Sequence, residues 1–142
     1  MSLPTQAWAD ATLLTITYLR AQLAALSTVT YPELVGVSVH ATLPQNRTLP
    51  VVLVSRVGGT LDATGITDSP RMYLECWADT APHAATIAGL VRDVMRLIAG
   101  VQSGFVVNNP REVGGPVDLT DPDTATPRYV LTVQFDVRAN AR

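Results

Sequence analysis

Lysine is absent from the 142-residue sequence, which holds one cysteine and two histidines. Because all ten basic residues are arginine, Schiff-base catalysis and phosphate binding by a loop lysine are excluded. The single cysteine, Cys76, excludes an internal disulfide and a thiolate metal cluster, and it suits a reducing compartment. The arginines are scattered along the chain and are outnumbered by 12 acidic residues, so no basic stripe is present. Sequence-specific nucleic-acid binding is therefore not expected.

Long apolar runs are also missing. No stretch approaches the roughly 20 apolar residues that cross a bilayer. The first eleven residues lack the basic and continuous apolar regions of a signal peptide, because Asp10 interrupts them. The composition, 47% hydrophobic and 15% charged, is that of a folded globular chain. We therefore expect one folded domain over residues 1–142, without a membrane segment and without export.

Hydrophobic periodicity predicts two helices. The first runs from Pro4 to Leu26, where Pro4 and Thr5 offer a helix start. The second begins at Thr80, which is followed by Pro82, and ends at Gly100. The predicted buried faces consist of Ala9, Leu13, Ile16, Leu19, Leu23 and Leu26 in the first helix, and Ile87, Leu90, Val91, Val94, Leu97 and Ile98 in the second.

Alternating and β-branched segments predict strands. These segments are Val37–Ala41, Pro50–Val57 ending at Gly58 and Gly59, Arg71–Ala78, Phe105–Val107 and Tyr129–Val137. Two long polar connectors are expected, Gly58–Pro70 and Asn108–Pro127. Grouped strands with few helices predict an α+β domain, a mostly antiparallel (mixed) sheet of about five strands with two main helices packed on one face.

Residues that could carry catalysis are few. His40 is expected on the polar face of a strand and His83 in the first turn of a helix, and neither has a partner or a metal-ligand spacing. Cys76 falls on the apolar face of a strand, where a thiol is inert. Trp8 and Trp77 are interpreted as core or core-edge residues, with interface anchoring as the alternative. The sequence thus predicts no catalytic residue, no metal site and no cofactor.

Two loop patterns superficially resemble ligand sites. Gly58, Gly59 and Gly65 lack the Gly-Lys-Ser/Thr that completes a phosphate loop, so a flexible loop is predicted. The acidic run Asp118–Asp123 lacks the central Gly and terminal Glu of a calcium loop, and Pro122 interrupts it. A solvated acidic loop is predicted there, with a weak divalent-cation site as the alternative.

Four segments taken together are typical of one family. They read VGVSVHATLP (35–44), LPVVLVSRVGGT (49–60), PRMYLECWAD (70–79) and APHAATIAGLVRDVMRLIAG (81–100). In these segments the chain resembles the tail terminator (tail completion) proteins of siphophages. The match is strongest over Leu49–Thr60 and Arg71–Gly100, and weaker similarity extends through Arg128–Arg138.

The resemblance implies a structural protein of the virion and not an enzyme. Such proteins form a hexameric ring on the finished tail tube, stop its polymerisation and present the surface that docks the head. The implied partners are further copies of the chain, the major tail tube protein and the head-tail connector (stopper) protein. DNA is implied only in transit through the ring. The implied location is the head-tail junction of a particle assembled in the host cytoplasm.

Two hypotheses about surface residues follow from a ring. Ring closure needs complementary heterologous patches, and arginine is favoured at interfaces, so exposed charges are candidates for subunit contacts. These candidates are Arg56, Arg71, Glu75, Arg111 and Glu112. The second hypothesis is that an acidic loop faces the channel, where like charge would keep DNA from adhering. Its residues are Asp118, Asp121 and Asp123.

Two alternatives remain open at this stage. The nearest is another head-tail connector or neck component of the same particle, which would differ in the neighbours that it binds. The other belongs to a different class, a small ligand-binding or enzymatic α+β domain with a cleft beneath the Gly58–Pro70 connector.

Overall fold

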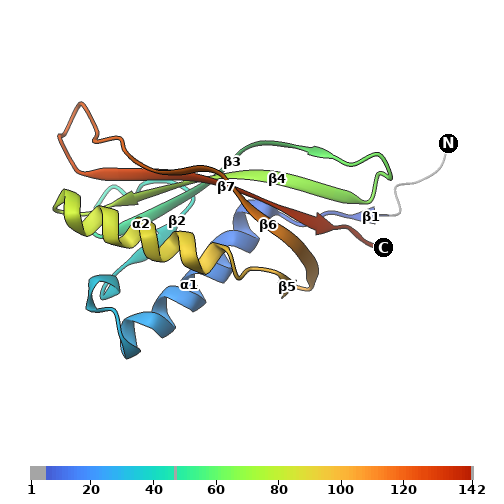
Figure 1. Ribbon diagram of the computed structural model, residues 1–142, viewed down its shortest axis with the longest axis horizontal. Coiled ribbons are helices and arrows are strands. Elements are labelled where there is room, and N and C mark those ends of the chain that lie inside the picture. Colours follow the sequence, from blue (N-terminus) through green and yellow to red (C-terminus); the bar gives the residue numbers. More distant parts are fainter. Residues whose placement is uncertain (1–5, 47, 142) are drawn as a thin grey trace.

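Two helices cover one face of a six-stranded sheet in the computed structural model (Figure 1). The model describes residues 6–46 and 48–141, apart from the side chains of residues 28 and 29. The helices are α1 (Ala11–Val29) and α2 (Ala81–Met95). In spatial order, the strands are β2 (Ser38–His40), β3 (Val51–Leu61), β4 (Thr67–Trp77), β7 (Arg128–Arg138), β6 (Phe105–Asp118) and β5 (Gly100–Gln102). The predicted α+β class is confirmed, with six strands where about five were expected.

The sheet is mixed, as predicted. Strand β2 runs parallel to β3, and the other pairings within this sheet are antiparallel. A 3-10 turn, η1 (Pro32–Leu34), precedes β2, and a separate small sheet joins β1 (Gln6–Ala7) to β8 (Asn140–Ala141). The sequence did not predict β1, β5 or β8, because strands of two or three residues are too short to show a period of two.

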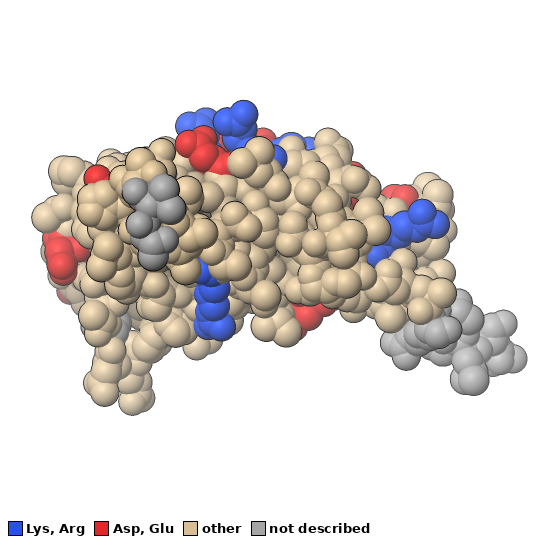
Figure 2. Space-filling view, turned by 90° about the horizontal axis from the view of Figure 1, so that it is seen from below, with Lys and Arg blue, Asp and Glu red and all other residues tan. Residues whose placement is uncertain are grey.

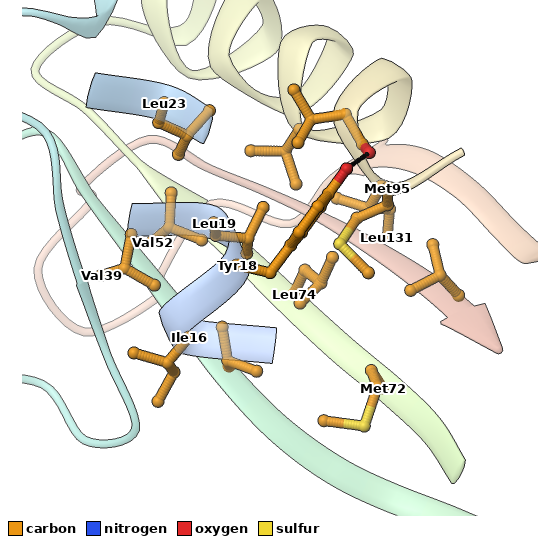
Figure 3. Packing of buried hydrophobic residues seen from close by; sticks show 14 of the residues in the cluster. Ile16, Tyr18, Leu19, Leu23, Val39, Val52, Met72, Leu74, Met95 and Leu131 are labelled. Atoms are coloured by element: carbon orange, nitrogen blue, oxygen red, sulfur yellow. Dashed lines mark hydrogen bonds between the residues drawn. The ribbon is translucent and has the colours of Figure 1, made fainter. Parts of the chain in front are cut away.

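The main hydrophobic core lies between the helices and the sheet. Alternate residues of β4 and β7, such as Met72, Leu74 and Leu131, point toward the helices and meet Leu19 and Leu23 of α1 (Figure 3). A smaller cluster on the opposite face of the sheet joins Val51, Leu53 and Trp77. Trp77 is therefore a core residue, as interpreted from the sequence, whereas Trp8 is 42% exposed.

Helix α1 begins seven residues later than Pro4, so the predicted start was wrong. The carboxylate of Asp10 accepts a hydrogen bond from the backbone N–H of Leu13 at 3.0 Å and caps the helix that starts at Ala11. Residues 6–7 instead form β1, while Pro4 and Thr5 lie outside the described residues. This cap satisfies one of the first N–H groups of the helix, which have no partner within the helix itself.

Helix α2 was predicted more accurately at its start than at its end. Thr80 caps it, as predicted, by accepting the backbone N–H of His83. The helix ends at Met95 and not near Gly100, so Leu97 lies beyond it and is 74% exposed. Leu13, which was also assigned to a buried face, is 57% exposed. Both leucines were wrongly predicted to be buried, because a periodic pattern does not show which part of a helix packs against the sheet.

Gly58 and Gly59 were misread as the end of the second predicted strand. Strand β3 continues through Gly58 and Gly59 by a bulge and pairs with β4 as far as Leu61. A Cβ on Gly59, whose φ is +102°, would lie 2.1 Å from the backbone oxygen of Ser69. The Gly58–Pro70 connector is therefore mostly a hairpin, in which β3 pairs with β4.

Strand β6 was predicted far too short. It extends past residue 107 to Asp118 and pairs with β7, so the loop after it spans only residues 119–127. The polar connector predicted for Asn108–Pro127 was wrong in its first half. Pro110, Pro116 and the glycine pair between them break the alternation in the sequence, and β6 accommodates them through three shifts of register.

Candidate assembly surfaces

The connection between β6 and β7 projects at one end of the molecule's long axis (Figure 1). We call residues 118–127 the acidic loop. Its backbone closes on itself, because Leu119 N–H donates to the carbonyl of Arg128 at 2.8 Å and Asp121 N–H donates to that of Thr126 at 3.1 Å. The hydroxyl of Thr120 donates to Asp118 at 2.7 Å. The loop is therefore held in shape by its own hydrogen bonds.

One carboxylate of this loop, that of Asp121, accepts hydrogen bonds from its neighbours. The hydroxyl of Thr124 donates to Asp121 at 2.6 Å, and this bond is the main reason that the pKa of Asp121 lies below its ordinary value. The backbone N–H of Asp123 also donates to Asp121. Among the described residues, no group of three or more His, Cys, Asp or Glu side chains is arranged to hold a metal ion.

A groove of about 400 Å³ lies between the C-terminal half of α2 and the strands β6 and β7. Its floor includes the buried residues Met95, Val133 and Phe135. Three arginines are among its lining residues, and we call it the arginine-rimmed groove. Its other lining residues are Arg92, Asp93, Arg96, Pro110, Arg111, Glu112 and Gln134.

Each rim arginine pairs with a carboxylate of the same chain. The N–O distances are 2.7 Å for Arg92–Glu112, 3.0 Å for Arg111–Asp136 and 3.5 Å for Arg96–Asp93. In all three pairs the arginine side chain is more exposed than its partner, 48% against 30%, 37% against 27% and 73% against 68%. Each pair therefore leaves part of its arginine side chain open to solvent.

Asp136 anchors one end of this rim. Ser69 donates to its carboxylate at 2.7 Å, and Arg111 and Asn109 donate to it at 3.0 Å and 3.4 Å. Partial burial alone would raise the pKa of Asp136, but these three hydrogen bonds outweigh it and lower the pKa. The network ties β4, β6 and β7 together beside the groove.

Arg56 and Asp68 form another ion pair, at the bulge of the β3–β4 hairpin. Two guanidinium nitrogens of Arg56 donate to the two carboxylate oxygens of Asp68 at 2.6 Å and 2.7 Å, and its Nε donates to the carbonyl of Gly58 at 2.9 Å. Asp68 is 9% exposed, so this pair is largely shielded from water on the carboxylate side. Arg56 thereby fixes the bulge in place.

Glu75 and Arg128 are paired on the face of the sheet that the helices leave open. Arg128 donates to Glu75 at 3.0 Å and to the carbonyl of Leu119 at 2.7 Å, and its guanidinium lies 5.1 Å from the centre of the Trp77 ring. Arg71, also on β4, is exposed and forms no ion pair with any residue that the structure describes.

The five charges predicted at subunit contacts do not form one patch. Arg111 and Glu112 lie at the arginine-rimmed groove, Arg56 lies at the β3 bulge, and Arg71 and Glu75 lie on the central strand β4. Sequence reasoning missed Arg92 and Arg96, which complete the rim. Arg96 directly follows α2 with helical backbone angles, so its spacing of four residues from Arg92 places the two on one helical face, but only the tertiary structure brings that face to β6.

The residues considered for catalysis or ligand binding lie in the core, in strands or in contacts between elements. The ring of His83 is hydrogen-bonded at 2.8 Å to the carbonyl of Glu33, a link from α2 to η1. Cys76 is completely buried, and this burial raises the pKa of its thiol. His40 lies half-buried in β2. Gly58 and Gly59 lie within β3, and Gly65 lies in the turn that follows it.

The surface of the helix side is poor in charge. Figure 2 shows this side with charged side chains mainly near its margins. Helix α1 contributes one charged residue, Arg20, whose guanidinium donates twice to the carbonyl of Val39. Because that bond occupies the outer edge of β2, the edge is blunted against pairing with a foreign strand. In the described part of the chain, no helix is long and apolar enough to span a membrane.

The protein is thus a small α+β domain whose acidic loop and arginine-rimmed groove lie on its surface, where another protein could contact them. The family model for the tail completion protein gp17 matches residues 17–138. The chain belongs to this family of phage tail completion proteins, and the resemblance found in its sequence is confirmed. The family is one of structural proteins.

Two solved structures are similar to this chain. One is a chain of the virion of the native gene transfer agent (GTA) particle, with a TM-score of 0.62 and 20% identity over 93% of this chain and 99% of that chain. The other is the gp17 protein of bacteriophage SPP1, with a TM-score of 0.49 and 18% identity over 94% of this chain and 95% of that chain. A comparison with curated protein sequences gave no match.

Proposed function

We propose that this protein is the tail terminator of a long-tailed phage. In this proposal six copies form a ring on the end of the finished tail tube, stop tube polymerisation and provide the docking surface for the head-tail connector. The observation that carries the proposal is the family match across residues 17–138, which covers α1 from its second turn onward, all of α2 and the whole main sheet. The protein would thus reside at the head-tail junction of the virion after assembly in the host cytoplasm.

Surface chemistry supports a role in assembly. Several large apolar side chains are exposed at the edges of the sheet, among them Val57 and Leu61 on β3 and Val113 and Val117 on β6. Exposed apolar side chains that gather on opposite edges of one subunit are suited to heterologous contacts, which close into rings. Arg56, Arg111 and Glu112 lie on the parts of β3 and β6 that extend past the short strands β2 and β5, and they would contribute polar contacts to that interface, with Arg71 and Glu75 facing other partners. DNA would pass through the ring without specific binding.

Electron microscopy of tail tubes tests this function. Tubes of the same particle, assembled without the terminator, are mixed with the purified full-length protein. Sixfold rings at one end of each tube, together with an arrest of tube growth, are the expected result. Tubes that continue to lengthen while the protein stays free would overturn the proposal and favour another neck component, which binding to purified connector in the absence of tubes would then identify.

A further inference from the structure

The arginine-rimmed groove has hydrogen-bond donors left over for an incoming anion. A guanidinium carries five N–H donors. Arg96 approaches a single carboxylate oxygen, that of Asp93, at 3.5 Å, a long and exposed contact. Arg92 uses Nε and one terminal nitrogen on Glu112, and Arg111 uses one terminal nitrogen on Asn109 and Asp136. The rim can therefore bind a further carboxylate without losing its existing pairs.

The acidic loop has the complementary chemistry. It contains three carboxylates, and no basic residue occurs among its ten positions. Exposed apolar side chains adjoin these carboxylates, because Val117 is 54% exposed and Leu119 is 45% exposed. An apolar segment with carboxylates matches a groove with an apolar floor and a guanidinium rim. The volume of the groove, about 400 Å³, is large enough for a few side chains.

We propose that the acidic loop of one copy binds in the arginine-rimmed groove of the next copy. The inference rests on the proposed ring and names the contact that closes it. Loop and groove are different surfaces of one chain, so each copy would offer its loop to one neighbour and its groove to the other. Such a head-to-tail contact is heterologous and closes into a ring when the rotation per subunit allows it.

This contact gives the acidic loop a different place from the channel. Asp118, Asp121 and Asp123 would face a neighbouring subunit, and their charge would steer one copy onto the next. The two placements make opposite predictions about assembly. A loop in the contact must keep its charge for rings to form, whereas a loop that faces the channel can change its sign and leave rings intact.

A charge exchange between two variants tests the contact. Asp123→Arg reverses the charge of the loop at a carboxylate that accepts none of the hydrogen bonds holding the described loop together, and Arg96→Asp reverses the charge of the groove at its most loosely paired arginine. Each variant alone would juxtapose like charges at every contact, and we expect association at least about tenfold weaker than wild type. An equimolar mixture can alternate the two variants around an even-numbered ring, so every contact regains opposite charges.

The measurement is ring formation by full-length protein on tail tubes, counted by electron microscopy at several protein concentrations. The matched controls are Asp79→Arg and Arg138→Asp, which reverse exposed charges outside the loop and the groove. We expect both controls to assemble like wild type, both test variants to fail at concentrations where wild type assembles, and their mixture to recover. Circular dichroism melting of each variant shows whether a failed assembly reflects a failure to fold.

A disulfide provides a second measurement if either charge variant is unstable. Asp123→Cys and Arg96→Cys are combined in one chain, since the native Cys76 is buried and does not compete. Oxidation of capped tubes should give covalent oligomers up to the closed ring, and each single-cysteine variant should give none beyond a dimer.

Several outcomes would overturn the contact. These are charge variants that assemble singly as well as wild type, a mixture that fails to recover although both variants fold, or an absence of cross-linked oligomers. If wild type caps tubes and the charge variants also do so, the proposed function stands and this contact is wrong. If wild type neither forms rings nor caps tubes, the proposed function itself fails.

Discussion

The hydroxyl of Tyr18 in α1 donates a 2.6 Å hydrogen bond to the backbone carbonyl of Val94 in α2 (Figure 3). Both residues are buried, and burial raises the pKa of the phenol. The bond joins the two helices within the hydrophobic core, where few other polar groups are present. It therefore fixes how α2 lies against α1 and, through α2, where the rim of the groove lies.

Removing this hydroxyl should destabilise the fold modestly. Tyr18→Phe keeps the ring and deletes the donor, and we expect a loss of about 0.5–1.5 kcal/mol in the free energy of unfolding. The loss should not be larger, because the Val94 carbonyl also accepts the N–H of Leu97 at 3.1 Å. Urea denaturation measures it, with Tyr31→Phe at an exposed position as the control. Equal stability of the two variants would show that the buried bond contributes nothing.

The Arg56–Asp68 pair should matter more to stability than an exposed pair. Asp68→Ala removes the shielded carboxylate and leaves the Arg56 guanidinium without its two short hydrogen bonds, and we expect a cost of about 1–3 kcal/mol. Asp93→Ala removes the partner of Arg96 in an exposed pair at 3.5 Å, and about 0–0.5 kcal/mol is expected. Thermal unfolding compares the two. A larger effect at Asp93 than at Asp68 would contradict the argument.

Gly59 and Gly58 provide a matched test of the bulge. Both have positive φ, +102° and +137°, so alanine is strained at either position. A methyl group at Gly59 would also collide with the backbone of Ser69, whereas nothing lies within 4 Å of one at Gly58. We expect Gly59→Ala to cost about 2 kcal/mol more than Gly58→Ala, because backbone must move. Similar melting temperatures for the two variants would mean that the hairpin can shift freely.

The lowered pKa of Asp136 should make stability fall in acid. Because the folded-state pKa lies below the unfolded value of about 3.9, the contribution is complete above that value and is lost as the pH falls through the folded pKa. Denaturant midpoints measured from pH 7 down to pH 2 should therefore decrease below about pH 4. Asp136→Asn should flatten this decrease, and an unchanged profile would assign it to other carboxylates.

Local sequence signals were sufficient for some elements. The strand Arg128–Arg138 was predicted nearly whole, because its strict alternation reflects one buried and one half-exposed face. Thr80 was predicted as the cap of α2, because a threonine before proline satisfies helical N–H groups locally. The family resemblance, confirmed over residues 17–138, came from the order of such signals along the chain.

Other features depended on partners distant in the sequence. Strand β6 remains a strand despite its prolines and glycines because it pairs along its length with β7. Strand β3 continues beyond Gly58 and Gly59 because the hydrogen bonds between Arg56 and Asp68 hold the bulge in place. The groove forms only because α2 packs beside β6 and β7. This packing brings residues 92–96 next to residues 110–112 and 133–135. The sequence by itself determined the fold class, the helix cap and the alternating strands, since these arise from contacts between near neighbours. Only the tertiary structure decided the length of β6, the course of the hairpin and the grouping of the arginines, because register and packing join residues that no local pattern connects.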